Sequence, residues 1–351
     1  MKDRDETSSC HLSRRRVCSW ALAAPFLLAA SSPAFPGSVV EEEFVSLGGV
    51  EQWVGIRGGD RANPILLVVH GGPGDVLWPY ADRFRGWEKH FTVVLWDQRG
   101  AGRSFGRGGG DTTPDVHLAR IVDDGIALAE WLCRKFAKRK IILLGHSWGS
   151  TVGVGMAKKR PDLFAVYVGT GQVESWKASV DFQFDLLLAR ARATGDDPTI
   201  RELEAIGRPD PANTGQYFHF TRNYRAAMAA SDQAWLQSLR PLFQSHRGEK
   251  DYEDAGAGMS FSGQSVLPDQ VASDLATTAA RIDTVFFIIQ GAEDVITPTR
   301  CAADYFEKVV APHKEMALIA NAGHFAFLTN PDAFLSILTR KVRPIAIARG
   351  A

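Results

Sequence analysis

Ser147 is the residue of this chain whose surroundings point most clearly to chemistry. It lies in the run Gly-His-Ser-Trp-Gly at 145–149, with a glycine two residues away on each side. A short apolar run at 141–144 precedes it, and a helical pattern starting near Thr151 follows it. A serine on such a sharp strand-to-helix turn exposes its hydroxyl, and the flanking glycines are needed because the turn leaves no room for side chains. The pattern predicts that Ser147 is a nucleophile for acyl transfer.

The nucleophile needs an acid partner further along the chain. A serine hydroxyl is a weak nucleophile at neutral pH, so a base must take its proton and an acid must orient that base. Chains with this turn carry the groups in the order nucleophile, acid, histidine. Asp294 follows the apolar run 285–289 and is the predicted acid, while its neighbour Glu293 is the alternative.

The predicted base is His324, in the run Asn-Ala-Gly-His-Phe that follows the apolar run 317–320. His313 is the other histidine downstream of the acid. It precedes that run, beside a proline and a lysine, so a solvated loop position explains it better. The sequence therefore predicts a triad of Ser147, Asp294 and His324.

Attack on a carbonyl also builds negative charge on its oxygen, which backbone N–H groups usually stabilise. One predicted donor is the N–H of Trp148, directly after the nucleophile. The second is expected in the run His-Gly-Gly-Pro-Gly at 70–74, where glycines let a substrate approach the backbone. Gly72 is the predicted donor there, with Gly71 as the alternative; a turn without a catalytic role is the other reading.

Positioning these groups requires a sheet whose strands are buried on both faces. Nearly continuous apolar runs are typical of such strands, and helical stretches such as 118–136 and 302–310 alternate with them. The pattern predicts an α/β fold with a mostly parallel, doubly wound sheet, preceded by an antiparallel pair at 43–47 and 52–56. The apolar runs are 65–69, 91–96, 141–144, 166–168 and 285–289.

The segment 172–280 interrupts this alternation. It is rich in helix formers, it contains a turn-forming break at 207–211, and it lacks a buried-strand pattern. We interpret it as a helical cap inserted into the core, which comprises residues 35–171 and 281–351.

Residues 1–34 have the layout of a secretory signal. Three arginines at 14–16 precede an apolar run at 20–30 that is too short to span a membrane comfortably, and small residues follow. Arg14 and Arg15 also resemble a twin-arginine signal. The expectation is a periplasmic or secreted protein without stable membrane association after signal removal; an uncleaved anchor or a disordered tail is the alternative.

The charge balance points to a small partner. The 351 residues include 40 Lys+Arg and 40 Asp+Glu, so no net field favours nucleic acid. The expected partner is a small-molecule ester or amide, or a short peptide.

Four motifs together resemble the proline iminopeptidase branch of the α/β-hydrolase superfamily, and the resemblance runs from about residue 43 to 340. It implies an α/β-hydrolase fold, a serine hydrolase mechanism, no metal and no cofactor. It also implies that the loop 96–100 lies near the site entrance with a structural role. The motifs are HGGPG at 70–74, WDQRGAGRS at 96–104, GHSWGS at 145–150 and NAGHF at 321–325.

Substrate choice is where the chain departs from that branch, whose peptidases hold a free amino terminus with cap glutamates. Arg222, in the run Phe-Thr-Arg-Asn-Tyr at 220–224, stands where a glutamate is expected. Glu174, Asp181 and Asp185 are the carboxylates that could replace it, although a solvated helix face also explains them.

The predicted function is hydrolysis of a small carboxylic ester or amide through an acyl-enzyme. The alternative within the class is release of N-terminal proline or another residue from short peptides. A non-catalytic binding protein on the same fold is disfavoured because nucleophile, acid, base and oxyanion loop are all present. An epoxide hydrolase or dehalogenase would require a carboxylate in place of Ser147.

Overall fold

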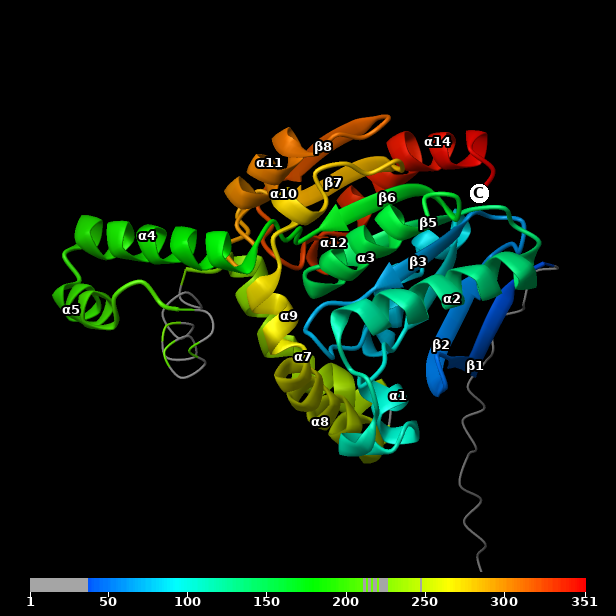
Figure 1. Ribbon diagram of the computed structural model, residues 1–351, viewed down its shortest axis with the longest axis horizontal. Helices are drawn as coiled ribbons and strands as arrows, with labels where there is room; N and C mark the ends of the chain where they lie inside the picture. The colour runs from blue at the N-terminus through cyan, green and yellow to red at the C-terminus, as the bar shows by residue number, and fades with distance from the viewer. Residues whose placement is uncertain (1–36, 211–212, 214–215, 217–219, 221–226, 247) are drawn as a thin grey trace, which may run out of the picture. The chain divides into compact units, whose positions relative to one another are not determined.

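The computed structural model describes residues 37–210, 213, 216, 220, 227–246 and 248–351, so the predicted signal lies outside the described residues. The framework is an eight-stranded sheet in the order β1-β2-β4-β3-β5-β6-β7-β8 (Figure 1). Strands β1, β2 and β4 pair antiparallel in that order, and every other neighbouring pair is parallel. The strands are β1 (Val39–Leu47), β2 (Val50–Gly58), β3 (Ile65–Val69), β4 (Thr92–Trp96), β5 (Ile141–His146), β6 (Phe164–Thr170), β7 (Val285–Gly291) and β8 (Lys314–Ile319).

The sheet confirms the predicted α/β class, and each apolar run that predicted a parallel strand lies in one, except that β4 begins at Thr92, one residue after the start of the run 91–96. Strand β8 differs from its predicted bounds: it begins at Lys314, before the apolar run at 317–320. Because β8 lies at the edge of the sheet and pairs only with β7, its first residues remain half-exposed and need not be apolar.

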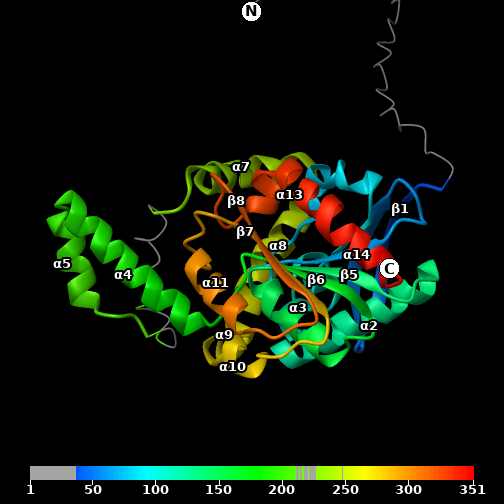
Figure 2. The same ribbon diagram turned by 90° about the horizontal axis from the view of Figure 1, so that it is seen from above.

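The apolar runs are continuous because successive residues of a central strand enter opposite cores. In β3, Leu66 and Val68 pack in the core on one face, while Leu67 and Val69 pack in the core on the other. Helices α2 and α3 cover one face, and α13 and α14 cover the other (Figure 2). A strand buried on both faces loses the alternation of a half-exposed strand.

The helices of the core connect and cover these strands. The predicted helix 118–136 is observed with the same bounds, and the second predicted helix, 302–310, begins earlier, at Thr299 after Pro298. The helical elements are η1 (Trp78–Phe84), η2 (Trp87–Lys89), α1 (Gly102–Arg107), η3 (Gly110–Thr112), α2 (Leu118–Phe136), α3 (Trp148–Lys159), α11 (Thr299–Lys308), α12 (Ala326–Thr329), α13 (Pro331–Ile337), η4 (Leu338–Val342) and α14 (Arg343–Ala348).

The described part of the segment between β6 and β7 consists of helices joined by turns and loops. Helix α5 ends at Ile206, and its C-cap residue Gly207, with a φ of +67°, lies at the predicted break. Helices α4 and α5 extend together away from the sheet, whereas α8 packs against α1 (Figures 1 and 2). The cap helices are α4 (Trp176–Thr194), α5 (Asp197–Ile206), α7 (Ala230–His246), α8 (Glu249–Ser265), α9 (Leu267–Ala272) and α10 (Leu275–Thr278).

The loop after β4 ties neighbouring elements of the core together. Gln98 donates from Nε2 to the carbonyl of His70, 2.9 Å away. Arg99 donates from Nε to Asp124 of α2 at 2.7 Å, and both side chains are almost completely buried. This ion pair joins the loop to α2.

Parallel pairing places the carboxyl ends of β3, β5, β6, β7 and β8 at one edge of the sheet. The glycine-rich loop follows β3, Ser147 follows β5, Asp294 follows β7 and His324 follows β8. Ligands of such sheets bind at this edge, so the fold gathers the predicted groups there.

Candidate active site

Ser147 occupies the sharp turn between β5 and α3. Its φ of 54° and ψ of −124° are a costly conformation for a residue with a Cβ. A Cβ built on Gly145 would lie 2.5 Å from the carbonyl oxygen of Gly149, and one built on Gly149 would lie 2.2 Å from that of Val69. Both glycines are therefore required because neighbouring backbone occupies the side-chain space.

Ser147 opens onto a cavity of about 150 Å³. The described residues that line it bear no formal charge and mix aromatic, aliphatic, hydroxyl and amide groups. They include both predicted oxyanion donors, so these lie at the same cavity as the predicted nucleophile. The lining residues are Gly72, Ser147, Trp148, Thr151, Val173, Trp176, Ser179, Val180, Gln183, Gln270, Ser273, Ile296 and Thr297.

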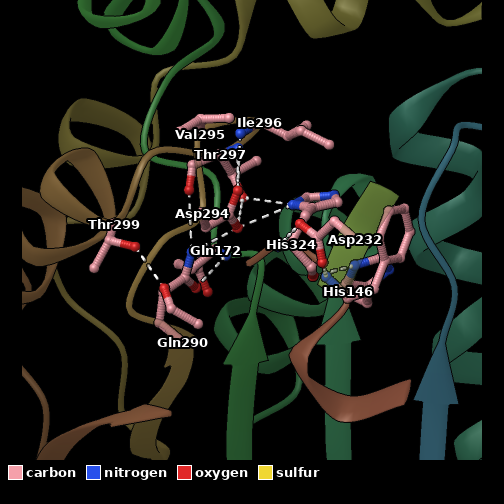
Figure 3. A network of polar contacts seen from close by, with 12 residues as sticks. His146, Gln172, Asp232, Gln290, Asp294, Val295, Ile296, Thr297, Thr299 and His324 are labelled. Carbon is pink, nitrogen blue, oxygen red and sulfur yellow. Dashed lines mark hydrogen bonds and ion pairs between the residues drawn. The ribbon is translucent and has the colours of Figure 1, made fainter. Parts of the chain in front are cut away.

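Asp294 is held by a dense set of donors after β7 (Figure 3). Its Oδ1 accepts from the backbone N–H groups of Ile296 and Thr297 at 2.8 and 3.0 Å. Its Oδ2 accepts from Gln290 Nε2 at 2.9 Å and from the Thr297 hydroxyl at 2.8 Å. Because the side chain is buried, these bonds replace the water that an ionised carboxylate would otherwise require.

The imidazole of His324 faces this carboxylate. Its Nδ1 lies 3.0 Å from Asp294 Oδ2 and 3.1 Å from the Thr297 hydroxyl oxygen (Figure 3). An ionised carboxylate only accepts hydrogen bonds, so this contact places the ring proton on Nδ1 and leaves the lone pair of Nε2 free to accept a proton.

The backbone at the end of β6 contacts both His324 and Ser147. A Cβ built on Gly171 would lie 2.9 Å from His324 Cε1, so the ring rests directly on this glycine. Ser147 N donates to the carbonyl of Thr170, the residue before Gly171, at 3.0 Å. The predicted base and nucleophile therefore each contact the end of β6 at neighbouring residues.

The charges around His324 favour its protonated form. Burial lowers the pKa of His324, but Asp294, and to a lesser extent Asp232 and Asp75, outweigh burial and raise it above the ordinary value. Such a ring accepts a proton more readily than an isolated histidine, which suits a general base.

Asp232, in the first turn of α7, is a site residue that the sequence did not indicate. Its Oδ2 accepts from the backbone N–H of His324 at 2.6 Å, and its Oδ1 accepts from that of Phe325 at 3.2 Å. The side chain is 1% exposed, and burial raises its pKa. No local pattern could reveal this contact, because it joins a cap helix to a distant loop.

His146, directly before the nucleophile, packs against the other side of the site. Its ring centroid lies 4.7 Å from that of His324, and its Nε2 donates to the His324 carbonyl at 3.1 Å. Burial and the neighbouring His324 hold the pKa of His146 well below its usual range, so the ring is neutral.

The loop 70–74 is anchored by its histidine. His70 Nε2 accepts from the backbone N–H of Gln98 at 3.1 Å, and His70 Nδ1 contacts the carbonyl of Gly71 at 2.9 Å. Burial lowers the pKa of His70 to about 4, so this ring is a neutral structural element. Gly72 follows with a φ of +106°, a conformation that favours glycine, and it is exposed at the cavity.

The two competing candidates lie elsewhere. Glu293 is exposed, and its backbone N–H donates to the carbonyl of Ala322. His313 is also exposed and lies before β8, where its ring contacts Phe287 at 5.7 Å between centroids. The geometry therefore favours Asp294 and His324 over these neighbours.

The three carboxylates considered for amine recognition all have cationic partners. Glu174 pairs with Lys308 at 2.6 Å, and both Asp181 and Asp185 pair with Arg208 on the exposed side of α4. None of the three is among the described residues lining the cavity at Ser147. Arg222 lies outside the described residues.

Asp75, after the glycine-rich loop, is a carboxylate that the sequence analysis missed. It is half-buried, and its Oδ1 accepts from the N–H of Val76 at 2.8 Å. Burial raises the pKa of Asp75 to about 6, although the Val76 bond and the nearby His324 act in the opposite direction. It borders a second, more open cavity of about 370 Å³, whose wall includes Leu236 of α7 and Met259 of α8.

The described residues contain no cluster of three or more His, Cys, Asp or Glu side chains arranged to hold a metal ion. None of their helices has both the length and the apolar character needed to cross a bilayer.

Comparison with known proteins agrees with this fold. A family model described as the alpha/beta hydrolase family matches residues 66–337. The chain therefore belongs to the α/β-hydrolase family and is a hydrolase.

Within that family the chain falls in the proline iminopeptidase-like branch. The probable aminopeptidase YbaC of Bacillus subtilis (strain 168) is 27% identical over 304 residues, which cover 85% of this chain and 95% of that protein. A proline iminopeptidase of Xylella fastidiosa (strain Temecula1) is 24% identical over 291 residues, covering 77% and 86%. The crystal structure of a proline iminopeptidase from Mycobacterium smegmatis superposes with a TM-score of 0.60 at 18% identity, covering 88% and 99%, and shows the shared fold.

Proposed function

We propose that this protein hydrolyses small, uncharged carboxylic esters or amides through an acyl-enzyme on Ser147. The observation that carries the proposal is the cavity at Ser147, whose described lining residues bear no formal charge. A charged acyl group would lose its hydration there without gaining a counter-charge, so a neutral group fits better.

In the first half of the proposed reaction, Ser147 Oγ bonds to the substrate carbonyl carbon while its proton passes to Nε2 of His324. The carbonyl electron pair moves onto oxygen, where the N–H groups of Trp148 and Gly72 receive the charge; removing one such donor typically costs about 2.7–4 kcal/mol. The bond to the leaving oxygen or nitrogen then breaks, and the leaving group takes the proton from His324.

The second half releases the acid. A water molecule gives a proton to His324 Nε2 and bonds to the acyl carbon, and Ser147 Oγ then leaves with that proton. Throughout, Asp294 keeps the Nδ1 proton of His324 in place and stabilises the imidazolium. The donors around Asp294 support this role because they hold the carboxylate in one orientation.

A second candidate, release of N-terminal residues from short peptides, is favoured by Asp75. It is a half-buried carboxylate near His324, beside a cavity, and no cation is paired with it among the described residues. A substrate ammonium group would supply the missing counter-charge. The relatives named as a probable aminopeptidase and as a proline iminopeptidase support the same candidate.

The test compares purified protein on p-nitrophenyl butyrate and on proline p-nitroanilide, with Ser147→Ala as the blank. We expect faster ester hydrolysis, abolished in the folded Ser147→Ala variant. Ester turnover that survives this substitution would remove Ser147 as nucleophile.

Asp75→Asn separates the two candidates. If Asp75 binds an amine, the substitution raises KM for the anilide and leaves KM for the ester unchanged, so the ester is the internal control. Faster release of proline than of butyrate, lost in Asp75→Asn, would replace the first candidate with the second.

We also propose that the protein acts after export, in the periplasm or outside the cell. The arginine-led apolar segment at the N-terminus supports this proposal.

A further inference from the structure

Asp232 joins the cap to the loop that carries the proposed base. The carboxylate belongs to the first turn of α7, and its two oxygens accept from the consecutive N–H groups of His324 and Phe325. These N–H groups come directly before the short helix α12, so they have no strand partner. A buried N–H pair of this kind needs an acceptor, and the cap supplies it.

The contact is too close to be incidental. A Cβ built on Gly323 would lie 2.1 Å from Asp232 Oδ2, so α7 and the loop meet without space for a side chain. Asp232 is also nearly inaccessible to solvent, which leaves these two N–H groups as its partners.

The acid loop has a comparable tie to another cap helix. Gln183 of α4 donates from Nε2 to the carbonyls of Val295 and Ile296, both at 2.8 Å. The backbone N–H of Ile296 in turn donates to Asp294. Each of the two loops that carry the Asp294–His324 pair is therefore held by a buried polar side chain of the cap.

We propose that Asp232 is a positioning residue that sets the orientation and proton affinity of His324, so that a productive base depends on the seating of the cap helix α7. This inference rests on the proposed function, in which His324 is the base. Asp232 acts in two ways: its hydrogen bonds place the His324 backbone, and its negative charge favours the protonated ring.

Other titratable groups also face His324. Asp294 approaches from the loop after β7, Asp75 from the loop after β3, and the neutral His146 from β5. None of these groups contacts the His324 backbone N–H. Among the described residues, Asp232 combines a negative charge with hydrogen bonds to this loop.

The decisive variant is Asp232→Asn, which keeps the shape but removes the charge. We expect kcat for the ester to fall by about tenfold or more, because the amide NH₂ group now faces a backbone N–H. We also expect the acid limb of the kcat/KM profile to move to lower pH. Asp197→Asn is the matched control, because Asp197 lies in the first turn of the cap helix α5 but is exposed, and it should change neither quantity.

Titration of the His324 imidazole by NMR in the resting protein provides a readout without turnover. A lower pKa of His324 in Asp232→Asn supports the proposal even if no substrate is found. Failure of the proposed function would show separately, as wild-type protein whose ester turnover does not exceed that of Ser147→Ala. Asp232→Glu retains the charge but displaces the loop, so kcat should fall while the pKa of His324 remains raised.

The proposal is overturned if the pKa of His324 in Asp232→Asn equals that in the wild type and kcat stays within about twofold. If Asp232→Asn does not fold, Asp232→Glu decides: unchanged kcat in that variant contradicts the positioning role.

Discussion

Gly323 and Asp232 are so close that a Cβ built on the glycine would lie 2.1 Å from the carboxylate oxygen and 3.0 Å from the Cβ of Ala229. The glycine before the proposed base is therefore required by a cap helix rather than by the conformation of its own loop. In the sequence, this glycine is visible only as part of the NAGHF motif at 321–325.

Gly323→Ala should consequently separate α7 from the loop. We expect a loss of about 1–3 kcal/mol in the free energy of unfolding, as for other overpacked sites. We also expect kcat to fall by up to about 100-fold, because a small displacement of a catalytic group suffices. Gly256→Ala in α8 is the control: nothing lies within 4 Å of its Cβ position, so helix propensity should make it neutral or stabilising. Equal effects of the two substitutions in denaturant titration would contradict this account.

The pH dependence of ester hydrolysis should report His324. Only the neutral ring accepts a proton from Ser147, so activity is lost as the pH falls through the pKa of His324. Because Asp294, Asp232 and Asp75 raise this pKa despite burial, the acid limb of kcat/KM should lie above the ordinary value of 6.5. A steady-state profile with its midpoint below that value would show that burial outweighs the carboxylates.

Thr297→Val should weaken the proposed acid. The substitution removes the hydroxyl that donates to Asp294 Oδ2 at 2.8 Å. Hydrogen bonds to charged groups contribute about 1.5–3 kcal/mol, so a loss of roughly 10- to 100-fold in kcat is expected. Thr299→Val is the matched control in the same segment, since its hydroxyl donates to the neutral carbonyl of Gly291 at 2.6 Å. Similar rates for the two variants would show that the Thr297 hydroxyl is dispensable.

Asp124→Asn should destabilise the core without touching the site. Arg99 would keep its buried charge while losing its counter-charge, and breaking a buried pair in this way costs about 3–5 kcal/mol. Glu204→Gln provides the comparison, because its pair with Arg192 is exposed and should contribute at most about 1 kcal/mol. Chemical denaturation of both variants measures the difference; equal midpoints would argue against a structural role for the Arg99 pair.

The proposed export can be checked by intact mass. Processed material from the periplasm or medium should begin near Phe35, because the small residues at 31–34 precede that position. Recovery of full-length protein only from the cytoplasm would contradict the proposal.

Much of the framework was predictable because it depends on local patterns. The buried runs gave the parallel strands, since a strand covered on both faces must be apolar along its length. The edge strand β8 was harder: Lys314 and Glu315 are tolerated because an edge strand is half-exposed, so its start carries no apolar pattern. The sequence carried a weak signal for the contact between Thr297 and Asp294. Short polar side chains such as Asp and Thr hydrogen-bond to groups a few residues away in turns.

The sequence by itself determined the α/β framework and the positions of Ser147, Asp294 and His324 at the ends of strands, because apolar periodicity and turn chemistry act over a few neighbouring residues. Only the tertiary structure decided that Asp232 holds the His324 loop, that Asp75 lies near His324, and that the cavity at Ser147 is uncharged among its described residues. These features arise where the cap meets the core. Contacts between segments so far apart follow from how whole elements pack, and no local pattern encodes them.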